Sequence, residues 1–213
     1  MAQDGPTPLE RFINGILPEN PIYRQVLGMC PTLAVTNGMK EAMTMAAAVA
    51  FVLTCANIVT SLIRGLLKPH LRILVFTLTI ATFVTIADRV LAAFMYDMSK
   101  GLGPYIPLII VNCVIICRCE VCASKQGVVT AAGDAIGQSI GFGLGLASIA
   151  AVREIIGNGS LFGFTIVPEA YWPRWGIMLL PPGAFLTLGL LMGGFNLLSA
   201  RSEKRKQAAA NKA

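Results

Sequence analysis

Two cysteines at matching positions are the residues of this chain best suited to chemistry. Cys30 lies nine residues after Pro21, and Cys113 lies nine residues after Pro104. Nine residues of helix rise about 13 Å, roughly half of a 30 Å hydrocarbon core, so each cysteine is expected near the middle of a bilayer. A thiolate at that depth is costly unless a cation pairs with it. The spacing therefore predicts a buried metal site.

Cys30 and Cys113 supply only part of such a site. An iron–sulfur cluster normally takes four cysteine ligands, so a similar partner chain is expected to supply the other two. A lone membrane cysteine is ordinarily a small buried hydrophobe. That interpretation is applied to the remaining cysteines, which are Cys55, Cys117, Cys119 and Cys122. The only histidine, His70, follows a proline and is expected in a solvated loop.

The composition indicates an integral membrane protein. The 213 residues are 55% hydrophobic and 13% charged, with a mean hydropathy of +0.68, whereas soluble domains are about 25% charged. Uncharged runs at 42–63 and 176–200 reach or exceed the roughly 20 residues that span a bilayer. No secretory signal peptide is expected, because residues 1–20 lack an apolar core.

The net charge of +6 does not indicate a nucleic-acid partner. Much of it lies in the tail Arg201–Lys206, which directly follows the last apolar run. Basic residues in that place are typical of an anchor on anionic membrane lipid. Membrane lipid is therefore predicted as a partner, and nucleic acid is not.

Six hydrophobic segments divide the chain into two similar halves. In each half a short segment precedes two long ones, so the halves are 21–97 and 104–199. Three segments per half is an odd number, so the second half must cross the membrane in the opposite sense. The predicted fold is an all-α polytopic membrane protein built as two inverted three-segment repeats, each starting with a short half-helix. The predicted segments are 22–37, 42–63, 71–96, 105–119, 128–156 and 176–199.

Basic residues in the loops predict the orientation. With the N-terminus inside, ten basic residues lie on the cytoplasmic side, against Lys40, Lys100, Arg153 and Arg174 outside. This asymmetry favours cytoplasmic N- and C-termini. The predicted division is a cytoplasmic N-terminal segment (1–20), one membrane domain (21–200) and a basic cytoplasmic tail (201–213).

Residues that interrupt helices surround both cysteines. Gly28 and Pro31 flank Cys30, and Asn112 precedes Cys113. Broken backbone at membrane depth is tolerated only where protein or a cavity covers it. Both short segments are therefore expected to face the bundle interior or a partner.

Charges and glycines within the long segments have structural interpretations. Asp88 and Arg89 are expected to pair with each other, and the charges at Asp134 and at Arg153–Glu154 are expected to act as interfacial anchors. The glycines from 141 to 145 are expected to permit close helix packing. The chain contains no Walker loop, dinucleotide fingerprint or hydrolase triad.

Four ordered motifs resemble the Rnf/Nqr family of small membrane subunits. The resemblance runs from about residue 20 to residue 198, and within the family it is strongest to the E-type subunits of Rnf ferredoxin:NAD⁺ oxidoreductases. The D-type subunits of Na⁺-translocating NADH:quinone oxidoreductases are the near alternative. The motifs are Leu-Gly-Met-Cys-Pro-Thr-Leu-Ala-Val-Thr at 27–36, Ile-Pro-Leu-Ile-Ile-Val-Asn-Cys at 106–113, Arg-Glu-Ile-Ile-Gly-Asn-Gly-Ser-Leu-Phe at 153–162 and Met-Leu-Leu-Pro-Pro-Gly-Ala-Phe at 178–185.

The resemblance implies a [2Fe–2S] cluster inside the bacterial cytoplasmic membrane. Its ligands in this chain would be Cys30 and Cys113, and a homologous A-type subunit of opposite topology would bring two more cysteines. Other subunits of the complex, which carry flavins and iron–sulfur centres, are further implied partners. The implied activity is electron relay coupled to Na⁺ or H⁺ translocation. Cys117, Cys119 and Cys122 depart from the family, which usually has glycine or apolar residues there.

Two other functional classes remain open on the sequence. Inverted repeats with broken helices are also typical of secondary transporters. A purely structural assembly subunit is the other class. A redox subunit with its partner would be brown with iron absorbance, whereas a transporter would be colourless.

Overall fold

The computed structural model describes residues 8–16, 18–65, 69–161, 164–165 and 176–210. These residues form helices and one antiparallel hairpin, in which Ser160 pairs with Thr165 and Leu161 with Phe164. The elements are α1 (Pro8–Ile16), α2 (Met29–Val35), α3 (Met39–Ile63), η1 (Pro69–Leu71), α4 (Arg72–Phe94), α5 (Tyr96–Leu102), η2 (Gly103–Tyr105), α6 (Pro107–Ile110), α7 (Cys113–Arg118), η3 (Cys119–Ala123, a π-helical turn), α8 (Val128–Asn158), β1 (Ser160–Leu161), β2 (Phe164–Thr165), α9 (Gly176–Leu179) and α10 (Pro181–Ala210).

The helical membrane fold is confirmed. Four of the described helices are long and apolar enough to span a membrane: α3, α4, α8 and the 181–201 part of α10. A fifth span is possible if the helices over 96–105 and 107–123, bent by 55°, count as one broken crossing. The order of one short and two long segments recurs in both halves, but the six-segment inverted repeat is not confirmed. The seven residues of α2 are about 10 Å long, too short to cross by themselves.

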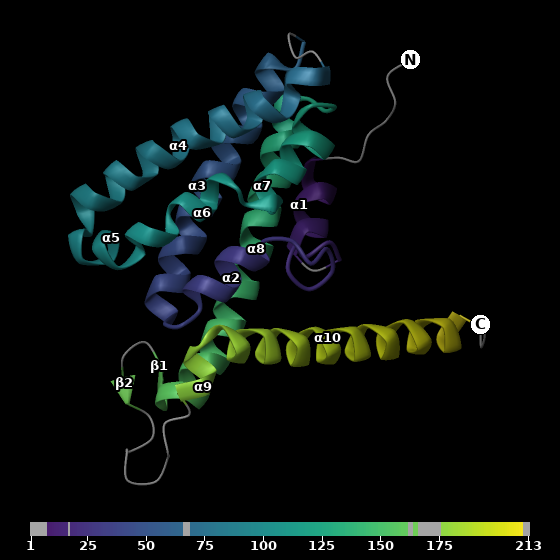
Figure 1. Cartoon of the computed structure of the whole chain (residues 1–213). Helices are drawn as coiled ribbons and strands as arrows, with labels where there is room; N and C mark the ends of the chain where they lie inside the picture. Colours follow the sequence, from purple (N-terminus) through teal and green to yellow (C-terminus); the bar gives the residue numbers. More distant parts are fainter. Residues whose placement is uncertain (1–7, 17, 66–68, 162–163, 166–175, 211–213) are drawn as a thin grey trace.

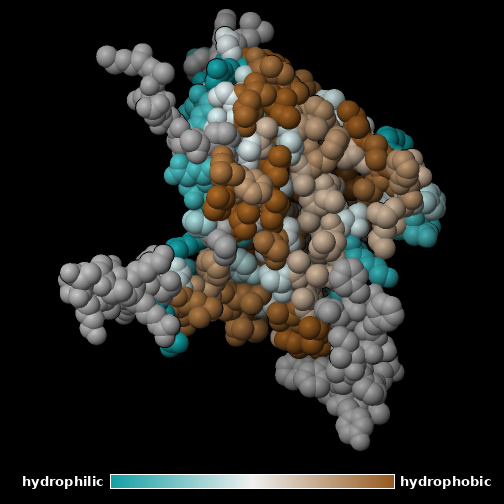
Figure 2. Space-filling model, turned by 180° about the vertical axis from the view of Figure 1, so that it is seen from behind, coloured by the Kyte–Doolittle hydropathy of each residue, from teal (hydrophilic) through white to brown (hydrophobic). Residues whose placement is uncertain are grey.

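Apolar side chains cover much of the outside of the molecule, as expected for a surface in contact with lipid. Figure 2 shows hydrophobic residues over much of one face, with hydrophilic residues towards its edges. On α4, the large exposed apolar side chains are Ile73, Leu74, Leu78, Ile86, Val90 and Phe94. This is the reverse of a soluble protein, where exposed apolar patches of this kind are uncommon.

Helix α8 is the centre of the bundle, and α1, α3, α9, α10 and η3 all pack against it (Figure 1). Its glycines allow the N-terminal region to approach very closely. A Cβ atom on Gly137 would lie 2.5 Å from the Phe12 carbonyl oxygen, and one on Gly145 would lie 2.6 Å from Ile22 Cδ1. A Cβ atom on Gly141 would meet the carbonyl oxygen of Gly15. The predicted packing role of this glycine region is thus confirmed at Gly141 and Gly145.

Arg153 lies inside the fold, so its predicted role as an interfacial anchor is wrong. The residue is fully buried, at 0% exposed. Its guanidinium satisfies groups left unpaired where α2 and α9 end, because the last carbonyls of a helix have no partner within it. The acceptors are the carbonyl oxygens of Met178 (3.0 Å), Leu179 (3.0 Å), Leu180 (3.3 Å) and Leu33 (3.4 Å) and the hydroxyl of Thr36 (2.6 Å).

The neighbouring Glu154 caps the start of another helix, α3. It is also buried, and its Oε2 accepts a hydrogen bond of 2.8 Å from the backbone N–H of Met39, the first residue of α3. One pair of adjacent charges on α8 therefore holds the end of α2 and the beginning of α3.

The expected pairing of Asp88 with Arg89 is also wrong, since no ion pair joins them in the part of the chain that the structure describes.

The last predicted segment is divided into two helices. The break falls at Leu180, before Pro181 and Pro182, because the residue before a proline disfavours helical backbone. Figure 1 shows α10 running away from the rest of the bundle. It is tied to the N-terminal region by a stacked pair, Tyr23 and Phe195, with ring centroids 5.3 Å apart. The predicted cytoplasmic position of both termini is not decided by this arrangement.

We expect Arg153→Ala to destabilise the protein strongly. The substitution leaves several buried carbonyls at the ends of α2 and α9 without a donor, a loss on the order of 3 kcal/mol. The measurement is the thermal unfolding midpoint of the purified complex, together with the amount of chain in the membrane. Arg89→Ala is the matched control, because Arg89 is an exposed arginine on α4. Equal stability of the two variants would contradict the role assigned to Arg153.

Candidate functional site

The structure brings the segments that carry the two predicted ligands together. The backbone N–H of Gly28, two residues before Cys30, donates a hydrogen bond of 2.9 Å to the Sγ atom of Cys113. Both cysteines are exposed on the surface and neither forms a disulfide. Two segments separated by more than 80 residues thus meet at their broken ends.

The approach to Cys30 is fixed by a buried asparagine. The side-chain oxygen of Asn20 accepts hydrogen bonds from the N–H groups of Ile22 (3.0 Å) and Tyr23 (3.1 Å), which folds the chain into a turn. The side-chain nitrogen of the same residue donates to the carbonyl oxygen of Gly141 on α8 at 2.9 Å. The chain after Pro21 is therefore anchored to the middle of the longest helix before it reaches α2.

Two residues with left-handed backbone precede α2. Val26 has a φ of 56°, which is unusual for a β-branched residue, and Gly28 has a φ of 73°. The carbonyl oxygen of Gly28 accepts a bond of 2.7 Å from the hydroxyl of Thr32, so the first turn of α2 is closed. The predicted break around Cys30 is confirmed at Gly28.

The approach to Cys113 is also broken. Asn112 is buried, and its Oδ1 accepts a hydrogen bond of 3.1 Å from the N–H of Val114, which caps the start of α7. Its Nδ2 atom is buried and has no partner in the described structure. Cys113 is the first residue of α7, so the sulfur lies at the break itself. The predicted interruption at Asn112 is confirmed.

The two thiols fit half of the ligand set of a [2Fe–2S] cluster. Cys thiolates are the usual ligands of such clusters, and four are normally needed. In the part of the chain that the structure describes, no group of three or more His, Cys, Asp or Glu residues is placed to hold a metal ion. Two exposed thiols are too few for such a cluster, so the remaining ligands would have to come from another chain. The assignment of Cys30 and Cys113 as ligands stays a prediction.

A largely apolar cavity of about 560 Å³ lies beside Cys113. Cys117, one helical turn further along α7, also lines it, as do Phe76 and other apolar side chains of α4 and α7. An ion pair between Arg72 and Glu120, at 3.1 Å, also borders the cavity. The cavity therefore gives Cys113 an apolar surrounding on the side of α4.

The other cysteines are placed as packing residues. Cys119 and Cys122 are buried, while Cys55 and Cys117 are partly exposed. The Sγ of Cys119 donates to Oδ1 of Asn57 at 3.3 Å, and the Thr60 hydroxyl lies 3.8 Å from the same sulfur. None of these contacts joins them to Cys30.

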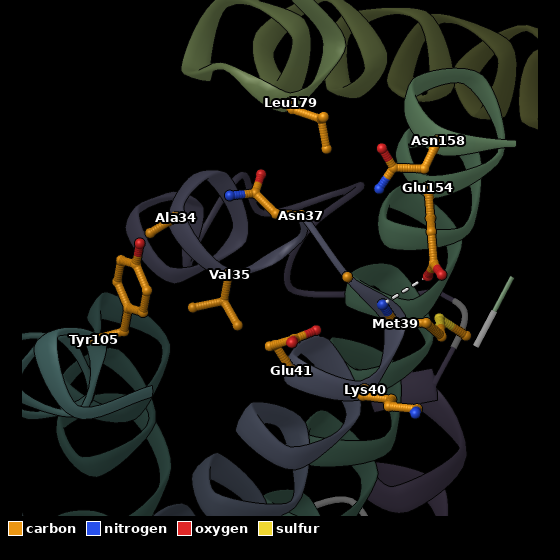
Figure 3. A pocket seen from close by; sticks show the side chains of 11 residues that line it. Ala34, Val35, Asn37, Met39, Lys40, Glu41, Tyr105, Glu154, Asn158 and Leu179 are labelled. Carbon is orange, nitrogen blue, oxygen red and sulfur yellow. Dashed lines mark hydrogen bonds between the residues drawn. The ribbon is translucent and has the colours of Figure 1, made fainter. Parts of the chain in front are cut away.

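A second cavity of about 510 Å³, with a mixed polar and apolar lining, lies between the end of α2, the start of α3 and the end of α8. Figure 3 shows Glu154 and Glu41 near its floor, with the hydrogen bond from the Met39 N–H to Glu154. Both carboxylates lie close to the start of α3, where negative charge is favoured. Their position is thus explained by the start of α3, and no cysteine is among the described residues that line this cavity.

Sequence reasoning missed the ion-pair group around Arg118. Arg118 at the end of α7 lies 3.6 Å from Asp134 on α8 and 3.4 Å from Glu19, and the side chains of Arg118 and Asp134 are only 5% and 1% exposed. Asp134 was expected to be an interfacial anchor, but it is a buried link between α7 and α8. An intramembrane charge is expected to find a partner of opposite sign, which was the available signal. Which partner it finds depends on the fold.

Comparison with known proteins finds one family model and several relatives from the same kind of membrane complex. The model of the family described as "Rnf-Nqr subunit, membrane protein" matches residues 9–192. The chain is 44% identical over 188 residues to the E-type subunit of the Na⁺-translocating ferredoxin:NAD⁺ oxidoreductase complex of Acetobacterium woodii, covering 88% of this chain and 95% of that protein. It is 38% identical over 202 residues to the E-type subunit of the proton-translocating ferredoxin:NAD⁺ oxidoreductase complex of Clostridium ljungdahlii, covering 95% and 94%.

A related complex is matched as well. The D-type subunit of the Na⁺-translocating NADH-quinone reductase of Aeromonas hydrophila is 40% identical over 187 residues, covering 86% of this chain and 89% of that protein. The match of the family model over most of the chain agrees with the four motifs, which lie in the same region. The chain therefore belongs to the Rnf-Nqr family of membrane subunits.

Proposed function

We propose that this chain is the E-type membrane subunit of an Rnf complex, an ion-translocating ferredoxin:NAD⁺ oxidoreductase. It supplies two of the four ligands, Cys30 and Cys113, to a [2Fe–2S] cluster inside the membrane. A homologous A-type subunit of opposite topology supplies the other two, and the remaining subunits of the complex bring flavin and iron–sulfur carriers. The chain lies in a bacterial cytoplasmic membrane.

The observation that carries the proposal is the contact between Gly28 and Cys113. A hydrogen bond of 2.9 Å joins the two broken segments. It runs from the N–H of Gly28, two residues before one predicted ligand, to the Sγ atom of the other, Cys113. Both sulfurs remain exposed, which a shared site requires. A purely structural subunit would have no need of two exposed thiols on segments that are joined in this way.

Each part of the site has a role in electron relay. When bound, the cluster accepts and donates single electrons. Cys30 and Cys113 would hold it at the breaks of two helices, and the cavity beside Cys113 gives it a largely apolar surrounding. Asn112 and Gly28 fix the backbone on either side, so the sulfur atoms keep their positions while the charge of the site changes.

The coupled ion is proposed to be Na⁺ or H⁺. Relatives named as Na⁺-translocating and as proton-translocating are both similar to this chain over most of its length. Broken helices at membrane depth are suited to alternate access, because small movements of half-helices open one side and close the other. A secondary transporter would share this architecture but would hold no iron.

We expect Cys30→Ala or Cys113→Ala to abolish the cluster and NAD⁺-linked electron transfer, because either loss leaves three ligands. Cys55→Ala, Cys117→Ala, Cys119→Ala and Cys122→Ala are the matched controls and should each retain most activity. The measurement is iron and acid-labile sulfide content and the reduced EPR signal of the intact complex. A loss of iron in Cys119→Ala together with full iron in Cys30→Ala would contradict the ligand assignment.

We expect the chain expressed without its partner subunit to hold no stable cluster. The reason is that this chain supplies only two of the four ligands that a cluster normally needs. The measurement is the iron content and EPR spectrum of the chain purified alone, with the co-expressed pair as control. A full, EPR-active cluster in the chain alone would show that all of its ligands lie in this sequence.

The proposed orientation places both termini in the cytoplasm, as the basic residues of the 64–72 loop and the tail indicate. Reporter domains fused after Ala200 and after Lys100 should therefore be active on opposite sides of the membrane. The first is expected to be cytoplasmic and the second extracytoplasmic. A reporter after Ala200 that is active only outside would overturn the orientation.

A further inference from the structure

Gly28 is held in place more firmly than a turn requires. Its φ of 73° lies in the left-handed region, and its Cα faces two packed side chains. A Cβ atom at this position would lie 2.6 Å from Cε2 of Phe142 and 3.0 Å from Cγ2 of Val114. Both of those residues are fully buried, at 0% exposed. Neither of them has room to move away from Gly28 without disturbing the core.

Gly28 is packed between two helices, α8 and α7. Phe142 comes from the middle of α8, and Val114 follows Cys113 on α7, so Gly28 lies between the central helix and the helix that carries the sulfur. The other side of this segment is anchored by Asn20, whose amide donates to the carbonyl oxygen of Gly141, the residue before Phe142. Residues 141 and 142 of α8 thus fix both the start of the turn and the position of Gly28.

The N–H of Gly28 is consequently aimed at one atom, the Sγ of Cys113. A hydrogen bond from an N–H to a cluster sulfur stabilises the more negative, reduced state, and such bonds are among the factors that set the potential of an iron–sulfur centre. The unusual φ of 56° at Val26 lies on the same short path. Backbone strain of this kind persists only where the surrounding structure imposes it.

We propose that Gly28 is a positioning residue for the reduction potential of the site: the close packing of Phe142 and Val114 beside it keeps its N–H on the sulfur of Cys113. The inference rests on the proposed function, because a potential exists only if Cys113 holds a redox centre. It concerns a residue that is not a ligand, and it makes α8 part of the redox machinery through Phe142.

The test is an EPR-monitored redox titration of the intact complex with three variants. Phe142→Leu keeps an apolar core residue but removes the ring that fills the space beside Gly28. The N–H of Gly28 should then be held less closely on the sulfur, and the midpoint potential should shift to a more negative value at full iron content. Gly28→Ala should shift it further in the same direction or lower the iron content. Gly143→Ala is the matched control, because a Cβ atom there would lie 3.5 Å from that of Ala46, an ordinary contact. Its potential should equal that of the unmodified complex.

A spectroscopic measurement tests the contact directly. In a complex labelled with ¹⁵N only at glycine, pulsed EPR of the reduced cluster should show a ¹⁵N coupling. The coupling should be lost in Gly28→Ala, where residue 28 is no longer labelled, and retained in Gly143→Ala. An unchanged coupling in Gly28→Ala would show that the Gly28 nitrogen is not next to the cluster sulfur.

The outcomes separate this inference from the proposed function. If the complex holds no cluster that depends on Cys113, both fail. Suppose that the cluster is present and depends on Cys113, but that Phe142→Leu and Gly28→Ala both keep the potential of the unmodified complex. Then only the role of Gly28 is overturned. If Gly28→Ala does not assemble, Phe142→Leu decides: a negative shift supports the inference, and an unchanged potential refutes it.

Discussion

The fold depends on satisfying the backbone groups that broken helices leave unpaired. In a membrane protein no bulk water reaches such groups in the apolar region, so the protein itself must supply their partners. Arg153 does this for the ends of α2 and α9, and Glu154 does it for the start of α3. Asn112 does the same for the start of α7. Without these side chains, the short helices that carry Cys30 and Cys113 would have free polar ends in an apolar setting.

Most of these supports converge on α8. Its C-terminal part carries the charged pair that holds α2 and α3, while Asp134 nearer its beginning lies 3.6 Å from Arg118 of α7. Its middle, at residues 141 and 142, contacts Asn20 and Gly28. The helix is therefore in contact with both broken segments at once. A movement of α8 would be transmitted to the backbone beside the sulfur of Cys113, which links the packing of the bundle to the properties of the site.

The two predicted ligands, Cys30 and Cys113, lie at the surface of the protein. Buried charges and close glycine packing hold the inner side of the broken segments rigidly, whereas the cysteines are exposed on the outer side. In the proposed function, a second chain would complete the ligand set at this exposed position. Cys119 and Cys122 are buried instead, and Cys119 packs against the core residue Asn57.

The sequence by itself determined the helical membrane class, the long helices and the places where the backbone breaks. The segments predicted at 42–63, 71–96 and 128–156 agree within a few residues with α3, α4 and α8, because long apolar runs are local signals. Gly28 and Asn112 marked the breaks because residues that interrupt a helix are also local signals. The tertiary structure alone decided which groups meet: that Arg153 lies inside and not at an interface, that Asp134 pairs with Arg118, and that the Gly28 N–H points at Cys113. These contacts join residues between 16 and 120 positions apart, and only the packing of α2, α7 and α8 in three dimensions fixes them.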